Sequence, residues 1–255
     1  MRILFIGDIV SQAGRSSTQR NLKDLVNKHE IDFVIANGEN VAHGKGITEK
    51  LYKELLSYGI DVVTLGNHFL LASESLNVLE RSENLVRPLN IHSSIPGSGS
   101  KVFECKGKKI RVTNLLGKVF INDLNPSNPF DAIDEVLKES NEAIHFVDFH
   151  AEATAEKLSL GWYLDGKVSA VIGTHTHVPT ADERILPQGT AYLTDVGMTG
   201  PYDGIIGTRR DLVIHKQRTG LPVKFDIQEG DAQFNACVID IDDESGKAKE
   251  IYRIN

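Results

Sequence analysis

Short apolar runs that end in polar residues recur along the chain, and they predict a parallel β-sheet core. Within each run the apolar residues are mostly consecutive, which is typical of strands buried on both faces. The runs are Arg2–Ile6, Phe33–Ala36, Asp61–Leu65, Ile144–Phe149 and Val168–Ile172. Segments with helical spacing of apolar residues lie between several of them, so the expected fold class is α/β.

Helices are predicted between these strands. Leucine and valine recur at helical spacing in Ser16–His29, and the preceding residues Ser11–Arg15 are expected to form a loop. Thr48 is a candidate N-cap of the next helix, and Gly59 is placed to end it in a left-handed conformation. Further helices are expected at Ala72–Arg81, Phe130–Glu139 and Thr154–Leu164, and a surface helix is expected to begin at Arg209.

The pattern changes near the C-terminal end, where apolar and polar residues alternate. Val223–Ile227, Gln233–Ile241 and Ala248–Ile254 show this alternation and are separated by turn signals, so they predict an antiparallel meander. A parallel core that is extended or faced by antiparallel strands predicts a mixed layered architecture. Because no internal repeat or long linker divides the chain, we expect one domain over residues 1–255.

Composition narrows the possible partners. The formal net charge of -7 argues against a broad nucleic-acid surface, although a small anionic substrate is still allowed where metal ions supply positive charge. Cys105 and Cys237 are interpreted as reduced thiols. No apolar segment reaches the roughly 18 residues of a membrane helix, so a cytoplasmic protein without membrane contact is expected. Because exposed strand edges of the meander can pair with a second copy of the chain, a homo-oligomer remains an open expectation.

The residues that follow the predicted strands carry the candidate chemistry. They are Asp8, Glu39, Asn40, Asn67, His68, His150, His175 and His177. In open α/β sheets the ligand crevice lies at the carboxyl ends of the strands, so the topology should gather these side chains in one place. Each residue alone has an ordinary explanation as a cap, a turn residue or a core histidine, but their occurrence at five strand ends favours a metal cleft.

The donor set suggests which ions such a cleft would hold. One Asp, one Glu, two Asn and three His exceed the needs of one tetrahedral ion and suit two ions that share a carboxylate. His175 and His177 could flank one ion or serve two neighbouring ions. Imidazole, carboxylate and amide ligands without thiolate favour Fe or Mn, with Zn as an alternative, over Ca or Mg. Two such ions predict phosphoester hydrolysis by in-line attack of a metal-bridging hydroxide.

The motifs that contain these residues resemble a known family. Gly7-Asp8, Gly38-Glu39-Asn40, Gly66-Asn67-His68, His150 and Gly173–His177 resemble, in order and context, the motif set of the calcineurin-like metallophosphoesterases. The closer similarity is to their YmdB-like branch. That branch is indicated by Glu39-Asn40 where most relatives have an Asp, by the absence of a His two residues after Asp8, and by the stretches Thr180–Pro187 and Asp195–Gly204.

The resemblance implies a fold, a ligand set and an activity. The fold would be a four-layer α/β/β/α sandwich of mixed sheets with helices outside. One divalent or trivalent ion would be held by Asp8, Glu39, Asn40 and His177, and another by Glu39, Asn67, His150 and His175. Glu39 would bridge them, and His68 would be the general acid. The implied activity is a cyclic-nucleotide phosphodiesterase, with 2′,3′-cyclic nucleotides expected and 3′,5′-cyclic nucleotides open.

Two other functions remain open. The same two-metal site serves phosphomonoesterases and nucleotidases, because mono- and diesters need the same grip on phosphate oxygens. A weakly catalytic nucleotide-sensing regulatory protein linked to RNA metabolism is the third interpretation. It is motivated by Phe69-Leu70-Leu71, which stands where relatives commonly have a Trp-Asp pair after Asn67-His68. This departure puts the substrate rim and the hydrogen bonding of His68 in question.

Overall fold

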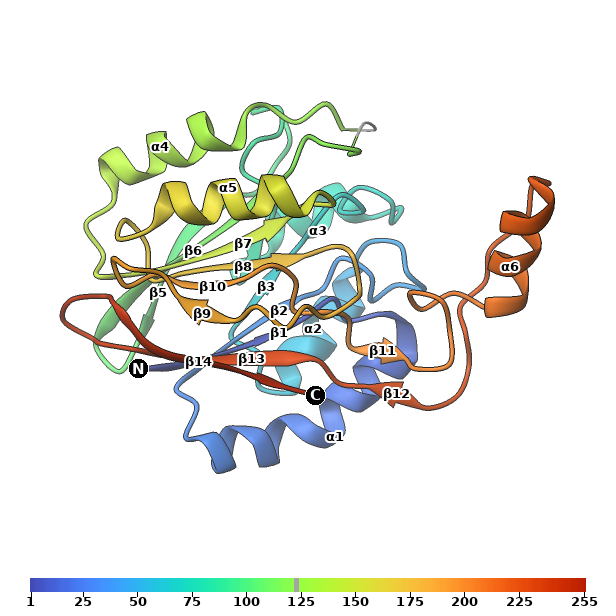
Figure 1. Cartoon of the computed structure of the whole chain (residues 1–255), viewed down its shortest axis with the longest axis horizontal. Coiled ribbons are helices and arrows are strands. Elements are labelled where there is room, and N and C mark those ends of the chain that lie inside the picture. Colours follow the sequence, from blue (N-terminus) through green and yellow to red (C-terminus); the bar gives the residue numbers. More distant parts are fainter. Residues whose placement is uncertain (122–123) are drawn as a thin grey trace.

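The computed structural model describes residues 1–121 and 124–255, and it contains two large β-sheets that face each other (Figure 1). The first sheet has the order β14 (Ala248–Ile254), β13 (Ala236–Ile241), β1 (Arg2–Ile6), β2 (Phe33–Asn37), β3 (Val62–Thr64) and β4 (Leu85–Val86). The second has the order β5 (Ser100–Cys105), β6 (Lys108–Leu116), β7 (Ile144–His150), β8 (Ala170–Thr174), β10 (Ala191–Leu193) and β9 (Arg184–Ile185). A small ribbon pairs β11 (Gly200–Pro201) with β12 (Ala232–Gln233).

Both large sheets are mixed. Strands β1 to β4 run parallel, and β13 pairs antiparallel with β1 so that Ile3 lies opposite Ile239. In the second sheet β6, β7, β8 and β10 are parallel, whereas β5 and β9 pair antiparallel at the two edges. The β13–β14 pair confirms the expected antiparallel strands at the C-terminal end. Parallel strands therefore occupy the middle of each sheet, as the consecutive apolar runs predict.

Helices cover the two outer faces. The helices on the first sheet are α1 (Ser11–His29), α2 (Glu49–Ser57) and α3 (Ser75–Arg81), and those on the second are α4 (Pro129–Glu139) and α5 (Thr154–Leu164) (Figure 1). Alternate side chains of β1 enter different layers: Ile3 and Phe5 pack between the sheets, whereas Leu4 and Ile6 pack under the helices. The ring centroids of Phe5 and Phe146 lie 4.9 Å apart across the sheet interface. These layers confirm the four-layer α/β/β/α sandwich.

Helix α1 begins five residues earlier than expected. The loop predicted over Ser11–Arg15 is wrong, because these residues form the first turns of the helix. Gly14 lies within these turns and serves a close approach, because a Cβ atom there would collide with the backbone oxygen of Thr199. The backbone N–H of Ser11 donates to the carbonyl oxygen of Asn40 at 3.0 Å, so the helix starts beside the loop after β2.

The predicted three-stranded meander is also partly wrong. Val223–Ile227 forms no regular strand, and only an isolated bridge joins Ile227 to Thr208. The run Gln233–Ile241 is interrupted between β12 and β13, where the carbonyl oxygen of Asn235 accepts from the backbone N–H of Gly7 at 3.0 Å. Alternation alone does not predict this interruption, because the interruption coincides with a contact to Gly7 in the loop after β1.

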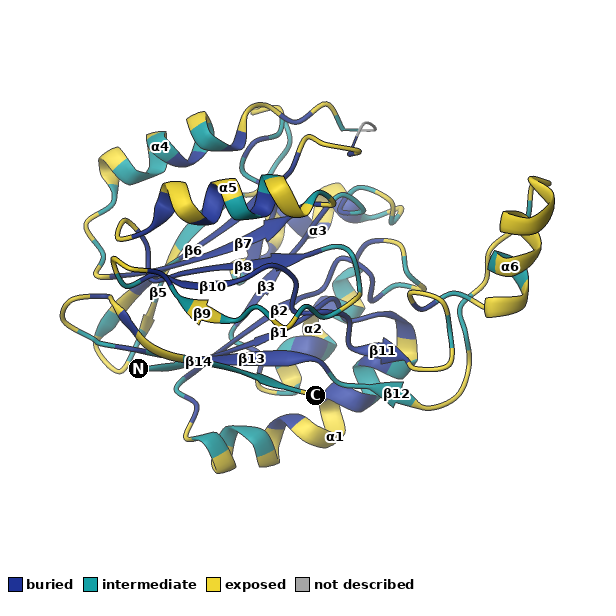
Figure 2. Cartoon of the chain, in the orientation of Figure 1, coloured by how far each residue is buried: buried dark blue, intermediate teal, exposed yellow. Residues whose placement is uncertain are grey.

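Residues 202–231, here called the arm, lie between β11 and β12; Gly207 is buried against Val10, whereas the helical part of the arm projects from the body (Figure 1). They include α6 (Arg210–Thr219), the surface helix expected near Arg209. No residue of α6 is buried, and Figure 2 shows the helix largely in the colour of exposed residues. Among the described residues, no helix is long and apolar enough to cross a membrane.

Candidate metal centre

The candidate ligands lie where the carboxyl ends of the two sheets meet. Asp8, Glu39, Asn40, Asn67 and His68 follow β1, β2 and β3 of the first sheet. His150 ends β7, and His175 and His177 follow β8 of the second sheet. The structure brings all eight residues together, because each parallel strand delivers its following loop to the same end of the sandwich.

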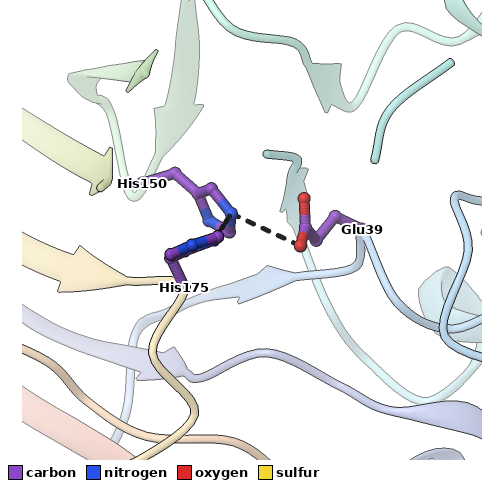
Figure 3. Close-up of side chains that lie close together, drawn as sticks. All are labelled: Glu39, His150 and His175. Atoms are coloured by element: carbon purple, nitrogen blue, oxygen red, sulfur yellow. Dashed lines mark hydrogen bonds and ion pairs between the residues drawn. The ribbon is translucent and has the colours of Figure 1, made fainter. Parts of the chain in front are cut away.

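One group of donors surrounds the imidazole of His150 (Figure 3). Its Nε2 atom lies 3.3 Å from Glu39 Oε1, 3.0 Å from His175 Nδ1 and 2.9 Å from Asn67 Oδ1. Figure 3 shows Glu39, His150 and His175 pointing toward one another from three different strand ends. One ligand atom from each of these three lies within 4.8 Å of the others, a spacing that one metal ion can span. This group coincides with one of the two ligand sets implied by the resemblance.

A second group lies on the other side of Glu39. Asn40 Nδ2 is 2.9 Å from Glu39 Oε1 and 3.2 Å from His177 Nε2, which in turn is 4.0 Å from Asp8 Oδ1. Asp8 is fully buried, and its Oδ1 atom has no hydrogen-bond partner among the described residues. A buried carboxylate oxygen without a donor is costly unless a cation lies beside it. The residues therefore fit a metal ion on this side as well.

The Asn40 amide connects this group to His68. Its Oδ1 atom lies 2.8 Å from His68 Nδ1, so the amide nitrogen, not the oxygen, faces Glu39 and His177. An Asn40 that binds a metal would present its oxygen instead, which requires the amide group to turn over. The backbone N–H of His68 donates to Glu39 Oε2 at 3.0 Å, and about a third of its side chain is exposed (35%). His68 thus lies beside the donors and remains open to a substrate.

The charges in the cleft favour a bound cation. Full burial raises the pKa of Asp8. Burial would also raise the pKa of Glu39, but the charge of His150 holds the pKa of Glu39 below its usual range. Burial alone would lower the pKa of His150, but the Glu39, Asp8 and Asp148 carboxylates raise it to about 9. Burial and the charge of His150 lower the pKa of His175 to about 3. The three carboxylates thus stabilise positive charge at His150, and a divalent ion would supply such charge.

The three histidines proposed as ligands, His150, His175 and His177, each have a second partner on the side of the ring away from the cluster. The pairs are His150 Nδ1 with Thr174 Oγ1 at 2.9 Å, His175 Nε2 with Glu152 Oε2 at 3.0 Å, and His177 Nδ1 with the carbonyl oxygen of Ile206 at 3.0 Å. A carboxylate and a carbonyl only accept, so the outer nitrogens of His175 and His177 carry protons. Their inner nitrogens then keep lone pairs for a metal.

A buried ion pair lies under the loop that carries His175. Lys157 Nζ pairs with Asp195 Oδ2 at 2.6 Å and donates to the carbonyl oxygen of Thr174 at 2.8 Å. Asp195 Oδ2 also accepts from the backbone N–H of Thr176 at 3.1 Å. These bonds hold both neighbours of His175, whose φ of 102° lies in a region that non-glycine residues rarely adopt.

The space between the donors leaves no room for a further side chain at Gly66. A Cβ atom on this residue would collide with Glu39 Oε2 and with the ring of His150. Glycine is therefore required for the close approach of the backbone to the donor cluster.

The Phe69-Leu70-Leu71 departure lies next to this site. Phe69 is fully buried in the core of the first sheet, whereas Leu71 is exposed.

Several residues of the site were not singled out from the sequence. Asp148 and Thr174 are fully buried beside His150, and Lys157 and Glu152 contact the His175 loop. Asp148 had a visible signal, because a carboxylate in an otherwise apolar strand needs buried partners. Lys157 and Glu152 gave no comparable signal, since Lys and Glu near a helix are usually solvent-exposed.

Comparison with known proteins assigns the chain to a family. Residues 4–254 match the model of the family described as YmdB-like protein, so the chain belongs to the YmdB-like family. It is 50% identical to the 2′,3′-cyclic-nucleotide 2′-phosphodiesterase of Bacillus subtilis (strain 168), over 100% of this chain and 96% of that protein. This similarity confirms the resemblance drawn from the strand-end motifs.

Solved structures agree with this assignment. The crystal structure of a phosphatase from Mycoplasma pneumoniae is 39% identical and superposes with a TM-score of 0.96, over 100% of this chain and 92% of the other. A 5′-nucleotidase precursor from Thermus thermophilus is 12% identical with a TM-score of 0.57, over 99% of this chain and 53% of that one. The second similarity concerns the fold alone.

Proposed function

We propose that the chain is a dinuclear metal-dependent phosphodiesterase that hydrolyses 2′,3′-cyclic nucleotides. The observation that carries the proposal is the pair of donor groups on either side of Glu39. Asp8, Asn40 and His177 would hold one ion, Asn67, His150 and His175 would hold the other, and Glu39 would serve both. The Bacillus subtilis relative, which is named for 2′,3′-cyclic-nucleotide 2′-phosphodiesterase activity, supports this substrate class.

The ions, Mn or Fe with Zn as an alternative, would supply the activated water and the positive charge that grips the phosphoryl oxygens. The side chains of the protein would donate the proton and hold the donors in position. His68, in contact with Asn40 and Glu39, would donate a proton to the leaving ribose oxygen as a general acid. Buried carboxylates and fixed histidines keep the donors in place before substrate arrives, which limits reorganisation during the reaction.

The experiment that tests this function is a substrate comparison with the Mn²⁺-loaded protein. Rates would be measured on 2′,3′-cyclic AMP, 3′,5′-cyclic AMP, 3′-AMP and 5′-AMP. The proposal expects the highest kcat/KM on 2′,3′-cyclic AMP, with a 3′-phosphate product when the 2′ bond is cut. Preference for a monophosphate would favour a nucleotidase, and tight binding without turnover would favour a nucleotide sensor. Either result would overturn the proposed activity.

A further inference from the structure

Asp148 accepts three side-chain hydrogen bonds at the centre of the sandwich. Its Oδ2 atom accepts from Asn37 Nδ2 at 3.1 Å and from Thr64 Oγ1 at 2.6 Å, and its Oδ1 atom accepts from Thr174 Oγ1 at 2.7 Å. All four side chains are fully buried and come from β2, β3, β7 and β8. The carboxylate therefore links both sheets directly beneath the metal cleft.

Hydrogen-bond partners fix the direction of these bonds. Asn37 Oδ1 accepts from the backbone N–H of Glu39 at 3.1 Å, and its Nδ2 also donates to the carbonyl oxygen of Leu65 at 3.0 Å. Its amide orientation is thus determined, and Nδ2 must face Asp148. An ionised carboxylate has no proton to give, so Thr64 and Thr174 must donate their hydroxyl protons to Asp148.

Thr174 then determines the proton on His150. A threonine hydroxyl has one proton, and in this arrangement it points to Asp148. The lone pairs of Thr174 Oγ1 therefore face His150 Nδ1, 2.9 Å away, and this contact is a hydrogen bond only if Nδ1 carries the proton. The reverse arrangement would place a lone pair of Thr174 against Asp148 Oδ1 at 2.7 Å in a fully buried site, where the two oxygens repel each other and no water can separate them.

We propose that Asp148 and Thr174 are positioning residues that keep the His150 proton on Nδ1, so that the Nε2 lone pair is directed to the metal. This proposal rests on the metal centre of the proposed function. It differs from the arrangement at His175, whose outer partner Glu152 is half exposed and accepts directly. Here the carboxylate acts through a hydroxyl, and solvent cannot replace either partner.

The test compares two substitutions of Thr174 in chelator-stripped protein. Thr174→Val keeps the shape of the side chain and removes the hydroxyl, whereas Thr174→Ser keeps the hydroxyl. Isothermal titration with Mn²⁺ alone should show about 10- to 100-fold weaker binding for Thr174→Val at the site that includes His150. Thr174→Ser should bind Mn²⁺ as tightly as the unmodified protein, and KM at saturating Mn²⁺ should be the same for all three.

A second variant tests whether the two residues act as a unit. Asp148→Asn should also weaken Mn²⁺ binding, and the double variant should bind no more weakly than the weaker single variant, because either change breaks the same chain of bonds. Melting temperatures of the metal-free proteins measure any loss of fold separately.

The outcomes separate this proposal from the function on which it rests. Unchanged Mn²⁺ affinity in folded Thr174→Val overturns the positioning role, as do additive losses in the double variant. Failure of the unmodified protein to bind Mn²⁺ overturns the metal centre itself, whatever the variants do.

Discussion

The candidate metal cleft lies at the ends of the strands, whereas helix α6 lies far out on the arm, and the fold holds the two very differently. In the cleft, Asp8, Glu39 and His150 are almost completely buried, and buried hydrogen bonds fix their neighbours. In the arm, α6 has no buried residue, and its polar contacts are mostly exposed. The difference shows that loops can be as well defined as strands when two sheets bury them at one site and buried hydrogen bonds hold them there.

The largest effect is expected for Glu39→Gln. Glu39 Oε1 lies next to both donor groups, so loss of its charge should release both ions and reduce hydrolysis to the background rate. Metal content by mass spectrometry and kcat/KM would be measured together. Full metal content in this variant would show that Glu39 does not bridge the groups.

His68→Ala should separate catalysis from metal binding. If His68 donates a proton to the leaving group, kcat should fall about 10²- to 10⁴-fold while the bound metal remains. Steady-state rates and metal analysis on the same preparation give the answer. An unchanged kcat would remove His68 from the mechanism.

Lys157→Met and Arg209→Met compare a buried ion pair with an exposed one. Lys157→Met leaves the carboxylate of Asp195 buried without its partner and should lower the free energy of unfolding by about 3–5 kcal/mol. Arg209 pairs with Asp211 on the arm, where both side chains are about half exposed, so Arg209→Met should leave stability unchanged. Urea denaturation of both variants gives the comparison, and equal losses would contradict it.

The smallest effect is expected for Ile214→Ser on α6. Its side chain is half exposed, so neither the melting temperature nor kcat/KM should change. Thermal denaturation and light scattering on the variant provide the check. A clear loss of stability or a change in molecular mass would show that the arm is covered in solution, and the contrast with the cleft would then fail.

Much of the fold could be predicted because each layer leaves a local signal. Consecutive apolar residues in Phe33–Ala36 and Val168–Ile172 marked parallel strands, and Thr48 and Gly59 behave as expected at the ends of α2: the Thr48 hydroxyl accepts from Leu51 N–H at 3.3 Å, and Gly59 has a φ of 103°. The start of α1 was missed because Ser11–Arg15 shows no helical spacing of apolar residues, and the contact of Gly14 with the distant Thr199 leaves no local signal. Contacts between residues far apart in sequence have no local pattern.

The site shows the same division. Strand-end placement was enough to select the candidate ligands, because strand topology alone brings them together. Their outer partners were largely hidden: Lys157 is buried in a helix that gives no sign of it, and Ile206 contributes only a backbone oxygen to His177. Such contacts join residues that are far apart in the sequence, and the spacing of apolar residues carries no information about them.

The most direct test of the central claim is a titration of chelator-stripped protein with Mn²⁺ while hydrolysis of 2′,3′-cyclic AMP is followed. If the cleft holds two ions that share Glu39, hydrolysis should be absent without metal and reach its maximum as the second equivalent binds per chain. Full turnover in the stripped protein, or no turnover with two equivalents bound, would contradict the account.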